Sequence, residues 1–367
     1  MENPKMCFYL GIDQHANQLT VSLRNGDGDV VLRKQVSTKP HKLVKFFEKL
    51  TARCAQNNCG FWAIVEVCGF NDWLIEMLRN FRCQRILLVQ PETSGSGRRQ
   101  KTDRRDAAKL SELLWMFRHR IEQNKVIDKI KIVNFPAANV RAQRRLTVLR
   151  KDARAQQTRS INRIKNILRR HNLQHHLPTK TFPTIAALKW CREIKLPTTD
   201  RLEMDHALTD LEYFGSRYKE LDKQIAELSK DDQDAALLMQ TPGIAEYSAV
   251  ALSSRINGIE RFKRPRSLAN YFGLTPGCRN SGEKDRIGKI TKAGSCMARW
   301  VLGQATKHIL RVDGPMRAWF RKLKRKRGAK VARVAVMRRL ATIIWHMLTK
   351  RKTYNEVRNL GIGLQNN

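Results

Sequence analysis

Short apolar runs alternate with amphipathic segments over the first third of the chain. The runs have strand-like lengths and occupy residues 7–15, 19–23, 30–36, 61–67 and 85–91. Leu and Phe recur at helical spacing over residues 41–53, and a second helix is expected over residues 71–80. Asn25-Gly-Asp-Gly-Asp29 separates the second and third runs, and its residues favour a hairpin turn. Three strands, a helix, a strand, a helix, a strand and a helix predict a small mixed α/β domain.

Two longer helical patterns occupy the middle of the chain. The first runs from about Val140 to Asn172 with apolar residues at helical spacing and an outer face rich in Arg and Lys. The second runs from about Thr199 to Ser229, and its apolar residues alternate steps of three and four, as in a coiled-coil seam. Prolines between residues 175 and 197 allow the chain to reverse. The pattern predicts an antiparallel helical hairpin that also dimerises, with an outer face that is either solvated or bound to nucleic acid.

The pattern changes again after Asp232. Residues 237–250 predict a helix, a Pro-Gly turn and a helix, as in a helix-hairpin-helix whose turn amides, including that of Gly243, hold a phosphate. A simple αα-hairpin fits the same residues equally well. A basic block from Arg317 to Arg327 precedes an amphipathic helix expected from about Lys330 to Lys350. We therefore divide the chain into three predicted domains, residues 1–135, 136–232 and 233–367.

The charge of the chain indicates the class of its partner. Lys and Arg number 71 against 33 Asp and Glu, which gives a net charge of +38 and favours a polyanion. Nucleic acid is expected rather than membrane, because no run of about 18 apolar residues occurs and the N-terminus lacks the apolar core of a signal peptide. Residues 236–367 carry 28 Lys and Arg against six Asp and Glu and are the expected main polyanion-binding surface. The eight cysteines lack zinc-site spacing, so we expect reduced thiols in a cytoplasmic protein.

Four carboxylates stand where strands and helices can bring them together. Asp13 and Glu66 each end an apolar strand pattern, and Asp103 and Asp106 face the same way at the expected start of a helix. Four clustered carboxylates would repel one another strongly unless a hard divalent cation held them. In a chain this basic, the cluster predicts metal-assisted chemistry on nucleic acid. The alternative is a non-enzymatic RNA-binding protein in which these acids are incidental surface charges.

Basic residues surround two further candidate sites. Residues 92–105 form a Gly/Ser-rich loop that turns basic before the acidic pair, and this loop either holds phosphates or is a solvated linker. Ser281 lies in a short Asn-Ser-Gly turn among cations that would stabilise charge on an attacked phosphate, although a serine there is also an ordinary turn residue. Ser295 fits better as a helix N-cap. The candidate nucleic-acid-binding residues are Arg98, Arg99, Lys101, Arg104, Arg105, Gly243, Arg279, Lys284, Arg286, Lys289, Lys292, Arg321, Lys322, Lys324, Arg325, Lys326 and Arg327.

The order of these features resembles one family over nearly the whole chain. Its motifs are Gly11-Ile-Asp13, Val65-Glu66, Lys101-Thr-Asp-Arg-Arg-Asp106, the coiled coil, Thr241-Pro-Gly-Ile244, and Asn280-Ser-Gly282 ahead of Gly288-Lys-Ile-Thr-Lys-Ala-Gly294. Together they resemble the DEDD transposases of bacterial insertion sequences. These are the bridge-RNA-guided recombinases, which are related in plan to the Piv-type DNA invertases.

The resemblance implies a fold and a metal site. The expected fold is an RNase H-like (RuvC-like) α/β N-terminal domain, a helical coiled-coil middle and a mostly α-helical C-terminal transposase domain. Asp13, Glu66, Asp103 and Asp106 would bind Mg²⁺, with Mn²⁺ as the alternative ion. Ser281 would attack DNA and form a covalent phosphoserine link. Because Asn280 stands where many relatives carry a further serine, Ser295 remains the competing nucleophile.

The resemblance also implies partners and a setting. Donor and target DNA would be paired with a noncoding bridge RNA that supplies the sequence specificity. A homodimer would assemble into a tetramer in the bacterial cytoplasm, on the nucleoid when active. The competing enzyme class is a RuvC-like, structure-specific endonuclease with water as nucleophile, which would keep the four acids but would have no need of the C-terminal third.

Overall fold

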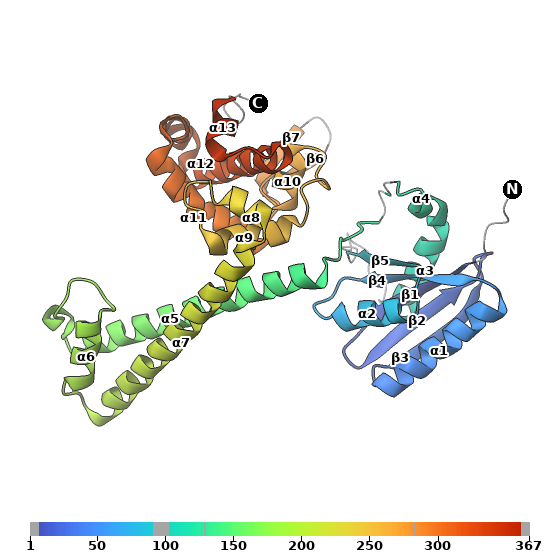
Figure 1. The fold of residues 1–367 in the computed structure, drawn as a ribbon, viewed down its shortest axis with the longest axis horizontal. Coiled ribbons are helices and arrows are strands. Elements are labelled where there is room, and N and C mark those ends of the chain that lie inside the picture. Colours follow the sequence, from blue (N-terminus) through green and yellow to red (C-terminus); the bar gives the residue numbers. More distant parts are fainter. Residues whose placement is uncertain (1–6, 91–102, 126, 128–129, 282–283, 361–367) are drawn as a thin grey trace. The chain divides into compact units, whose positions relative to one another are not determined.

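The computed structural model describes residues 7–90, 103–125, 127, 130–281 and 284–360, and the side chains of residues 278–287 lie outside this description. The chain divides into two compact units, residues 1–135 and residues 136–367 (Figure 1). Among the helices that are described, none has the length and apolar character needed to cross a membrane.

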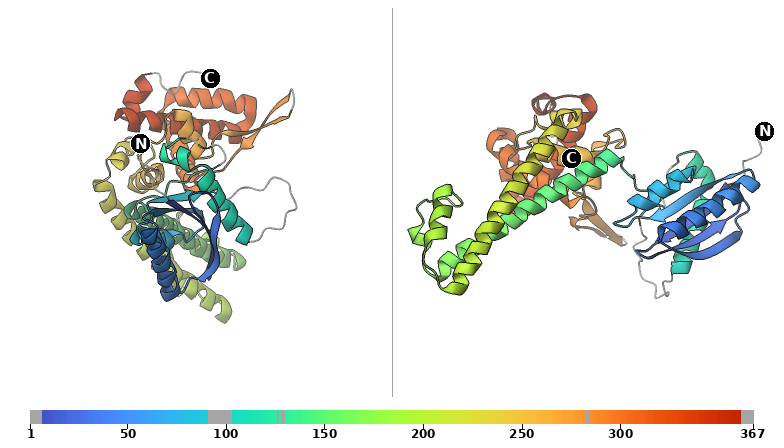
Figure 2. Two further views of the ribbon diagram at one scale, coloured as in Figure 1. Left: turned by 90° about the vertical axis from the view of Figure 1, so that its right-hand side faces the viewer. Right: turned by 60° about the horizontal axis from the view of Figure 1, so that its bottom comes forward.

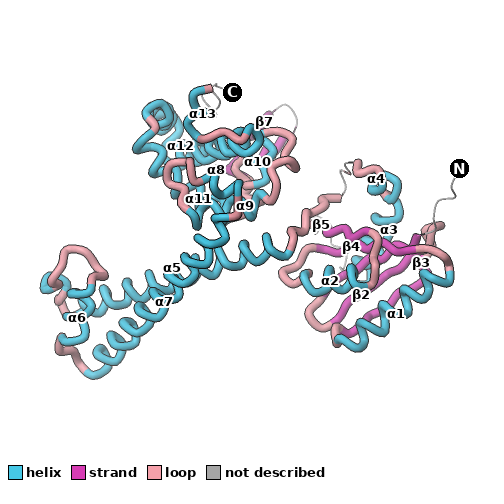
Figure 3. The backbone as a smooth tube through the Cα atoms, in the orientation of Figure 1, coloured by secondary structure: helices cyan, strands magenta, loops and turns pink. Residues whose placement is uncertain are grey.

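The first unit is a five-stranded mixed sheet with helices on both faces (Figure 3). Its elements are β1 (Cys7–Gln14), β2 (Gln18–Arg24), β3 (Val30–Ser37), α1 (Pro40–Gln56), β4 (Gly60–Glu66), α2 (Asp72–Asn80), β5 (Arg85–Val89), α3 (Asp103–Met116) and α4 (Arg118–Glu122). The strand order is β3-β2-β1-β4-β5, with β1 antiparallel to β2 and parallel to β4. The predicted order of strands and helices is confirmed.

Alternation along the central strands divides the core of this unit between two layers. Leu10 and Ile12 of β1 lie on the face that packs against α1 and α2, in a cluster with Phe47 and Leu74. Tyr9 lies on the opposite face, in a cluster that contains residues of α3. Successive side chains of a strand point to opposite faces, so every second residue of β1 belongs to the α3 side. The α3 side is where the candidate acids are found.

The second unit begins with two long helices that pack along each other. Its first elements are α5 (Ala138–Arg170), η1 (Gln174–His176), α6 (Ile185–Glu193) and α7 (Thr198–Lys230), and Figure 1 shows α5 and α7 as an antiparallel pair. Both long helices were predicted, whereas only a reversal of the chain was predicted where α6 lies. The buried contact includes Ile164 of α5 with Leu208 of α7. Leu149 of α5 and Leu228 of α7 are two of the apolar residues at helical spacing, but they are 51% and 37% exposed in the single chain.

The rest of the second unit is mainly helical. Its elements are α8 (Gln233–Leu238), α9 (Glu246–Ile256), α10 (Pro265–Tyr271), β6 (Pro276–Ser281), β7 (Lys284–Ile290), α11 (Cys296–Val312), α12 (Gly314–Lys350) and α13 (Tyr354–Asn359) (Figure 2). Two features were not predicted here. Ser281 is the last residue of β6 and pairs with Lys284 of β7, whereas no strands were expected beside the short Asn280-Ser-Gly282 turn. The basic block is part of α12, because Lys and Arg are good helix formers. Asp313 caps the start of α12, and the helix is kinked at Gly328, where φ is +79°.

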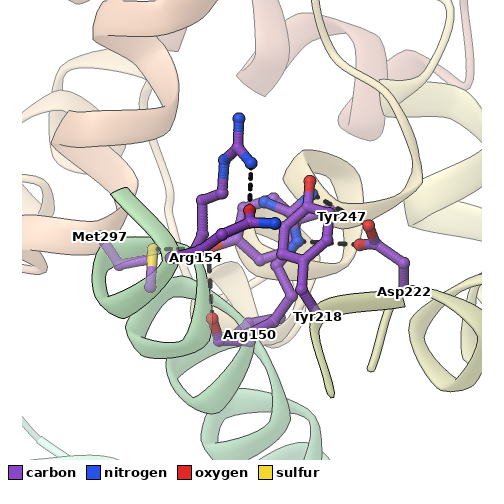
Figure 4. Close-up of polar contacts among 8 residues, drawn as sticks. Arg150, Arg154, Tyr218, Asp222, Tyr247 and Met297 are labelled. Carbon is purple, nitrogen blue, oxygen red and sulfur yellow. Dashed lines mark hydrogen bonds and ion pairs between the residues drawn. The ribbon is translucent and has the colours of Figure 1, made fainter. Parts of the chain in front are cut away.

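A group of polar and aromatic side chains joins α9 to the two long helices (Figure 4). Arg150 of α5 donates to Asp222 of α7 at 2.8 Å. Its guanidinium also lies over the rings of Tyr218 and Tyr247, 4.3 Å and 4.0 Å from their centroids. The Tyr247 hydroxyl donates in turn to the backbone oxygen of Thr147 at 3.2 Å. One arginine therefore contacts side chains from both of the helices that flank it.

Candidate active site

The carboxyl ends of two neighbouring parallel strands bring the first two acids side by side. The register pairs Ile12 of β1 with Val65 of β4, so Asp13 and Glu66 are the next residues in line. Ile12 and Val65 lie together in the core beneath α1 and α2. Because side chains alternate along a strand, Asp13 and Glu66 belong to the opposite face, which α3 covers.

A glycine allows α3 to lie directly on β1. A Cβ atom at Gly11 would stand 2.3 Å from the backbone oxygen of Ala107 and 2.4 Å from the backbone nitrogen of Ser111. These distances leave no room for a side chain, so the helix backbone rests on the strand. Asp103 precedes Ala107 by about one turn and therefore comes over the end of β1, beside Asp13. The role of this glycine in placing the acids was not apparent from the sequence.

Three side chains at this end of the sheet form a group suited to a divalent cation. His15 Nε2 lies 3.1 Å from Asp13 Oδ2 and 3.5 Å from Asp103 Oδ2. One donor atom from each residue lies within 4.8 Å of the other two. Two carboxylates and an imidazole fit an ion that accepts oxygen and nitrogen ligands. Among the residues described, the carboxylates of Glu66 and Asp106 are not part of this group.

The electrostatics of the group centre on Asp13. Burial raises the pKa of the Asp13 carboxyl, and the charges of Asp103 and Asp106 raise it further, while His15 opposes the shift. A raised carboxyl pKa means that its environment disfavours the ionised form. A bound cation would reverse this effect, because it favours the ionised carboxylate. The two acids of α3 are thus close enough to Asp13 to affect its ionisation, as their spacing in the sequence suggested.

A buried asparagine ties together the two strand ends that carry Asp13 and Glu66. Asn71 Nδ2 donates to Gln14 Oε1 at 2.7 Å and to the backbone oxygen of Glu66 at 3.0 Å. Its Oδ1 accepts a hydrogen bond from the backbone nitrogen of Cys68 at 2.7 Å. Asn71 and Gln14 are both buried. The sequence placed Asn71 only at the start of a helix and gave no sign of this role.

Replacing Asn71 with alanine should loosen the end of β4 that carries Glu66. The change leaves buried groups of Gln14 and of residues 66–68 without a partner, which we expect to cost about 1–3 kcal/mol. Hydrogen exchange of peptides covering residues 60–71 measures the effect locally. Asn134→Ala, at an exposed residue of the same unit, is the control. Unchanged exchange in Asn71→Ala would show that the hydrogen bonds of this side chain do not hold the strand end.

The serine candidates differ in what their surroundings show. Ser281 ends β6 and pairs with Lys284 of β7 in the backbone ladder. Its side chain and those of Arg279, Lys284 and Arg286 lie outside the described set. Ser295 caps α11, because its Oγ accepts a hydrogen bond from the nitrogen of Ala298 at 3.2 Å. The capping role predicted for Ser295 is therefore confirmed.

The candidate nucleic-acid-binding residues are exposed wherever the structure describes their side chains. Arg98, Arg99 and Lys101 lie outside the described residues. Gly243 is exposed in the turn between α8 and α9 with a φ of +83°, and a Cβ there would stand 2.6 Å from that of His308. The other exposed members are Arg104, Arg105, Lys289, Lys292, Arg321, Lys322, Lys324, Arg325, Lys326 and Arg327. The last six lie on α12, which therefore carries a dense basic surface.

Two residues beside the acids were missed from the sequence. His15 follows Asp13 by two positions, and a spacing of two in an extended segment places both side chains on one face, so this signal was available. Thr20 of β2 pairs with Asp13 across the sheet. Its side chain is 2% exposed, and among the described residues its Oγ1 has no hydrogen-bond partner. The position of Thr20 opposite Asp13 depends on the strand register and could not be predicted from the sequence.

Comparisons with known proteins agree with the motifs. The model of the Transposase IS116/IS110/IS902 family matches residues 235–321, and an IS110-type DEDD model described as a transposase matches residues 10–173. The transposase for insertion sequence element IS1111A of Coxiella burnetii is 26% identical over 310 residues, 79% of this chain and 78% of its own length. The Sinorhizobium fredii protein y4pF/y4sB, provisionally named a transposase, is 24% identical over 364 residues, 95% of this chain and 85% of its own.

Proposed function

This chain belongs to the insertion-sequence transposases of the IS116/IS110/IS902 family, and on that premise we propose that it is an RNA-guided DNA recombinase that works through a covalent phosphoserine link. Family membership makes it a DNA-processing enzyme, and its DEDD domain has an RNase H-like fold. The observation that carries the proposal is the convergence of Asp13, His15 and Asp103 at one end of the sheet in a chain with a charge of +38.

The acids and the serine have different roles in the proposed reaction. Asp13, Glu66, Asp103 and Asp106 hold Mg²⁺ or Mn²⁺ in this proposal, and such an ion supplies charge neutralisation and lowers the pKa of a hydroxyl. Ser281 Oγ loses its proton and forms a bond to the phosphorus, while the scissile phosphorus–oxygen bond breaks and the released DNA oxygen takes up a proton. The phosphoserine keeps the energy of the phosphodiester, so the reverse attack by a DNA hydroxyl reseals a strand without ATP.

The proposed assembly brings together parts from different copies of the chain. In the family plan, acids of one subunit meet the serine of another, and the coiled coil joins dimers into a tetramer. The exposed apolar side chains of Leu149 and Leu228 support a role of α5 and α7 in such contacts, because they leave apolar surface for a partner helix.

Nucleic acid would bind along the basic surface of the second unit. The segment Arg321–Arg327 of α12 has six exposed Lys and Arg side chains. The logarithm of the affinity should fall linearly with the logarithm of the salt concentration. Each phosphate that such cations neutralise should make this slope steeper by roughly 0.9. Contacts of this kind fix position without reading sequence, so specificity would come from base pairing with a noncoding RNA.

Exchanging the guide tests the RNA dependence of the proposal. Purified protein is incubated with Mg²⁺, donor and target DNA, and the noncoding RNA of its element, and joined strands are sequenced. We expect joining to require the RNA and to move to a new target when the target-pairing segment of the RNA is rewritten. Joining at the original target with the rewritten RNA, or without RNA, would contradict RNA guidance while leaving a DNA transposase.

A further inference from the structure

We propose that His15 is a direct ligand of the divalent cation that Asp13 and Asp103 hold, and that it makes the site favour Mn²⁺ over Mg²⁺. The inference rests on the proposed function, because it concerns the same metal site. It adds a nitrogen donor to a set that would otherwise consist of carboxylate oxygens.

The distances between the donor atoms fit a shared cation. Around an octahedral ion with ligands at about 2.1 Å, neighbouring ligand atoms stand roughly 3 Å apart. His15 Nε2 lies 3.1 Å from Asp13 Oδ2 and 3.5 Å from Asp103 Oδ2, close to that spacing. The three donors come from the end of β1 and the start of α3, so one side of the group is formed by the sheet and the other by the helix. The His15 side chain is 48% exposed, so its ring is reachable from solvent.

A second observation, the buried hydroxyl of Thr20 beside Asp13, also points to a bound ligand at this place. Thr20 pairs with Asp13 across β1 and β2, and its side chain lies on the same face of the sheet. Thr20 is 2% exposed, and its Oγ1 has no partner in the described part of the chain. A buried hydroxyl without a hydrogen bond is costly, so a group of this kind indicates a partner outside the described residues. A water bound to the cation would supply one.

The imidazole determines which ion the site prefers. Mg²⁺ is a hard ion that favours oxygen ligands and keeps several waters, whereas imidazole suits transition metals. Mn²⁺ accepts carboxylates and lies in the transition series, so adding one imidazole to the carboxylates of the proposed site favours it. If His15 instead only donated a hydrogen bond to the carboxylates, it would position them without affecting the choice of ion.

Pulsed electron paramagnetic resonance of bound Mn²⁺ distinguishes these roles. The full chain is titrated with Mn²⁺ and separately with Mg²⁺, and the bound Mn²⁺ is examined for coupling to ¹⁴N. We expect a coupling in the unaltered protein that His15→Asn removes, with Mn²⁺ affinity falling at least about ten-fold and Mg²⁺ affinity changing less than about three-fold. The matched control is His119→Asn, at a 67%-exposed histidine of α4, which should leave the coupling and both affinities unchanged.

The same titrations distinguish failure of the His15 ligand role from failure of the metal site itself. If Mn²⁺ binds, if Asp13→Asn removes it, and if no ¹⁴N coupling depends on His15, the ligand role of His15 is overturned and the metal site stands. If Mn²⁺ binding is absent or is unaffected by Asp13→Asn, both the metal site and the role of His15 fall. His15→Asn also removes only an exposed side chain, so loss of folding would not explain a loss of coupling with retained Mg²⁺ affinity.

Discussion

Gly11→Ala should separate α3 from β1 and destabilise the first unit by about 3 kcal/mol. The new methyl group would lie 2.3 Å from a backbone oxygen of α3 and 2.4 Å from a backbone nitrogen. Both atoms belong to a helix backbone, which cannot turn aside as a flexible side chain can, so the whole helix must move. Asp103 would move with it, and the group with Asp13 and His15 would open. We expect faster hydrogen exchange in residues 103–116 and weaker Mn²⁺ binding.

Gly69→Ala is the matched control for this substitution. A Cβ atom at Gly69 has no other atom within 4 Å, and the residue lies close to Glu66 in sequence. Alanine there should leave exchange in α3 and Mn²⁺ binding unchanged. If Gly11→Ala behaved like Gly69→Ala, the close packing of α3 on β1 would not be what places the acids.

The sequence predicted the parts of the site better than their contacts. Apolar alternation placed Asp13 and Glu66 at strand ends, and the spacing of Asp103 and Asp106 placed them at a helix start, as the structure has them. The hydrophobic pattern contained no information on how closely α3 packs on β1. That packing depends on glycine at position 11, because any side chain there would collide with the backbone of α3. The roles of Asn71 and Thr20 depend on register and loop geometry, which periodicity does not encode.

The second unit contains two features that were not predicted. The helix was expected only from about Lys330, because Lys and Arg dominate the segment before it. Met316, Trp319 and Phe320 nevertheless pack on the core at helical spacing, and Lys and Arg favour helix, so this signal was available in the sequence. Asn280 and Ser281 favour turns, and they end β6 directly before its antiparallel partner β7, so the turn signal marked the hairpin but not its strands.

Asp13→Asn and Ser281→Ala should each lower the rate of strand joining by about 10³-fold or more. The first change removes a charged donor from the proposed metal site, and the second removes the proposed nucleophile. Asp27→Asn, at an exposed turn residue of the unit that contains Asp13, should keep the joining rate of the unaltered protein. Ser295→Ala should lose a helix cap worth about 1 kcal/mol and still join strands. Joining rates are measured with labelled donor and target DNA, the guide RNA and Mg²⁺.

Covalent capture of the DNA tests the central claim most directly. Protein, guide RNA and labelled DNA are incubated with Mg²⁺, denatured, and examined for DNA that remains attached to the chain, and the attached residue is located by mass spectrometry. The account predicts an adduct on Ser281 that disappears in Ser281→Ala and in Asp13→Asn and persists in Ser295→Ala. Cleaved DNA without an adduct, at a rate unchanged by Ser281→Ala, would contradict it and indicate a nuclease that uses water.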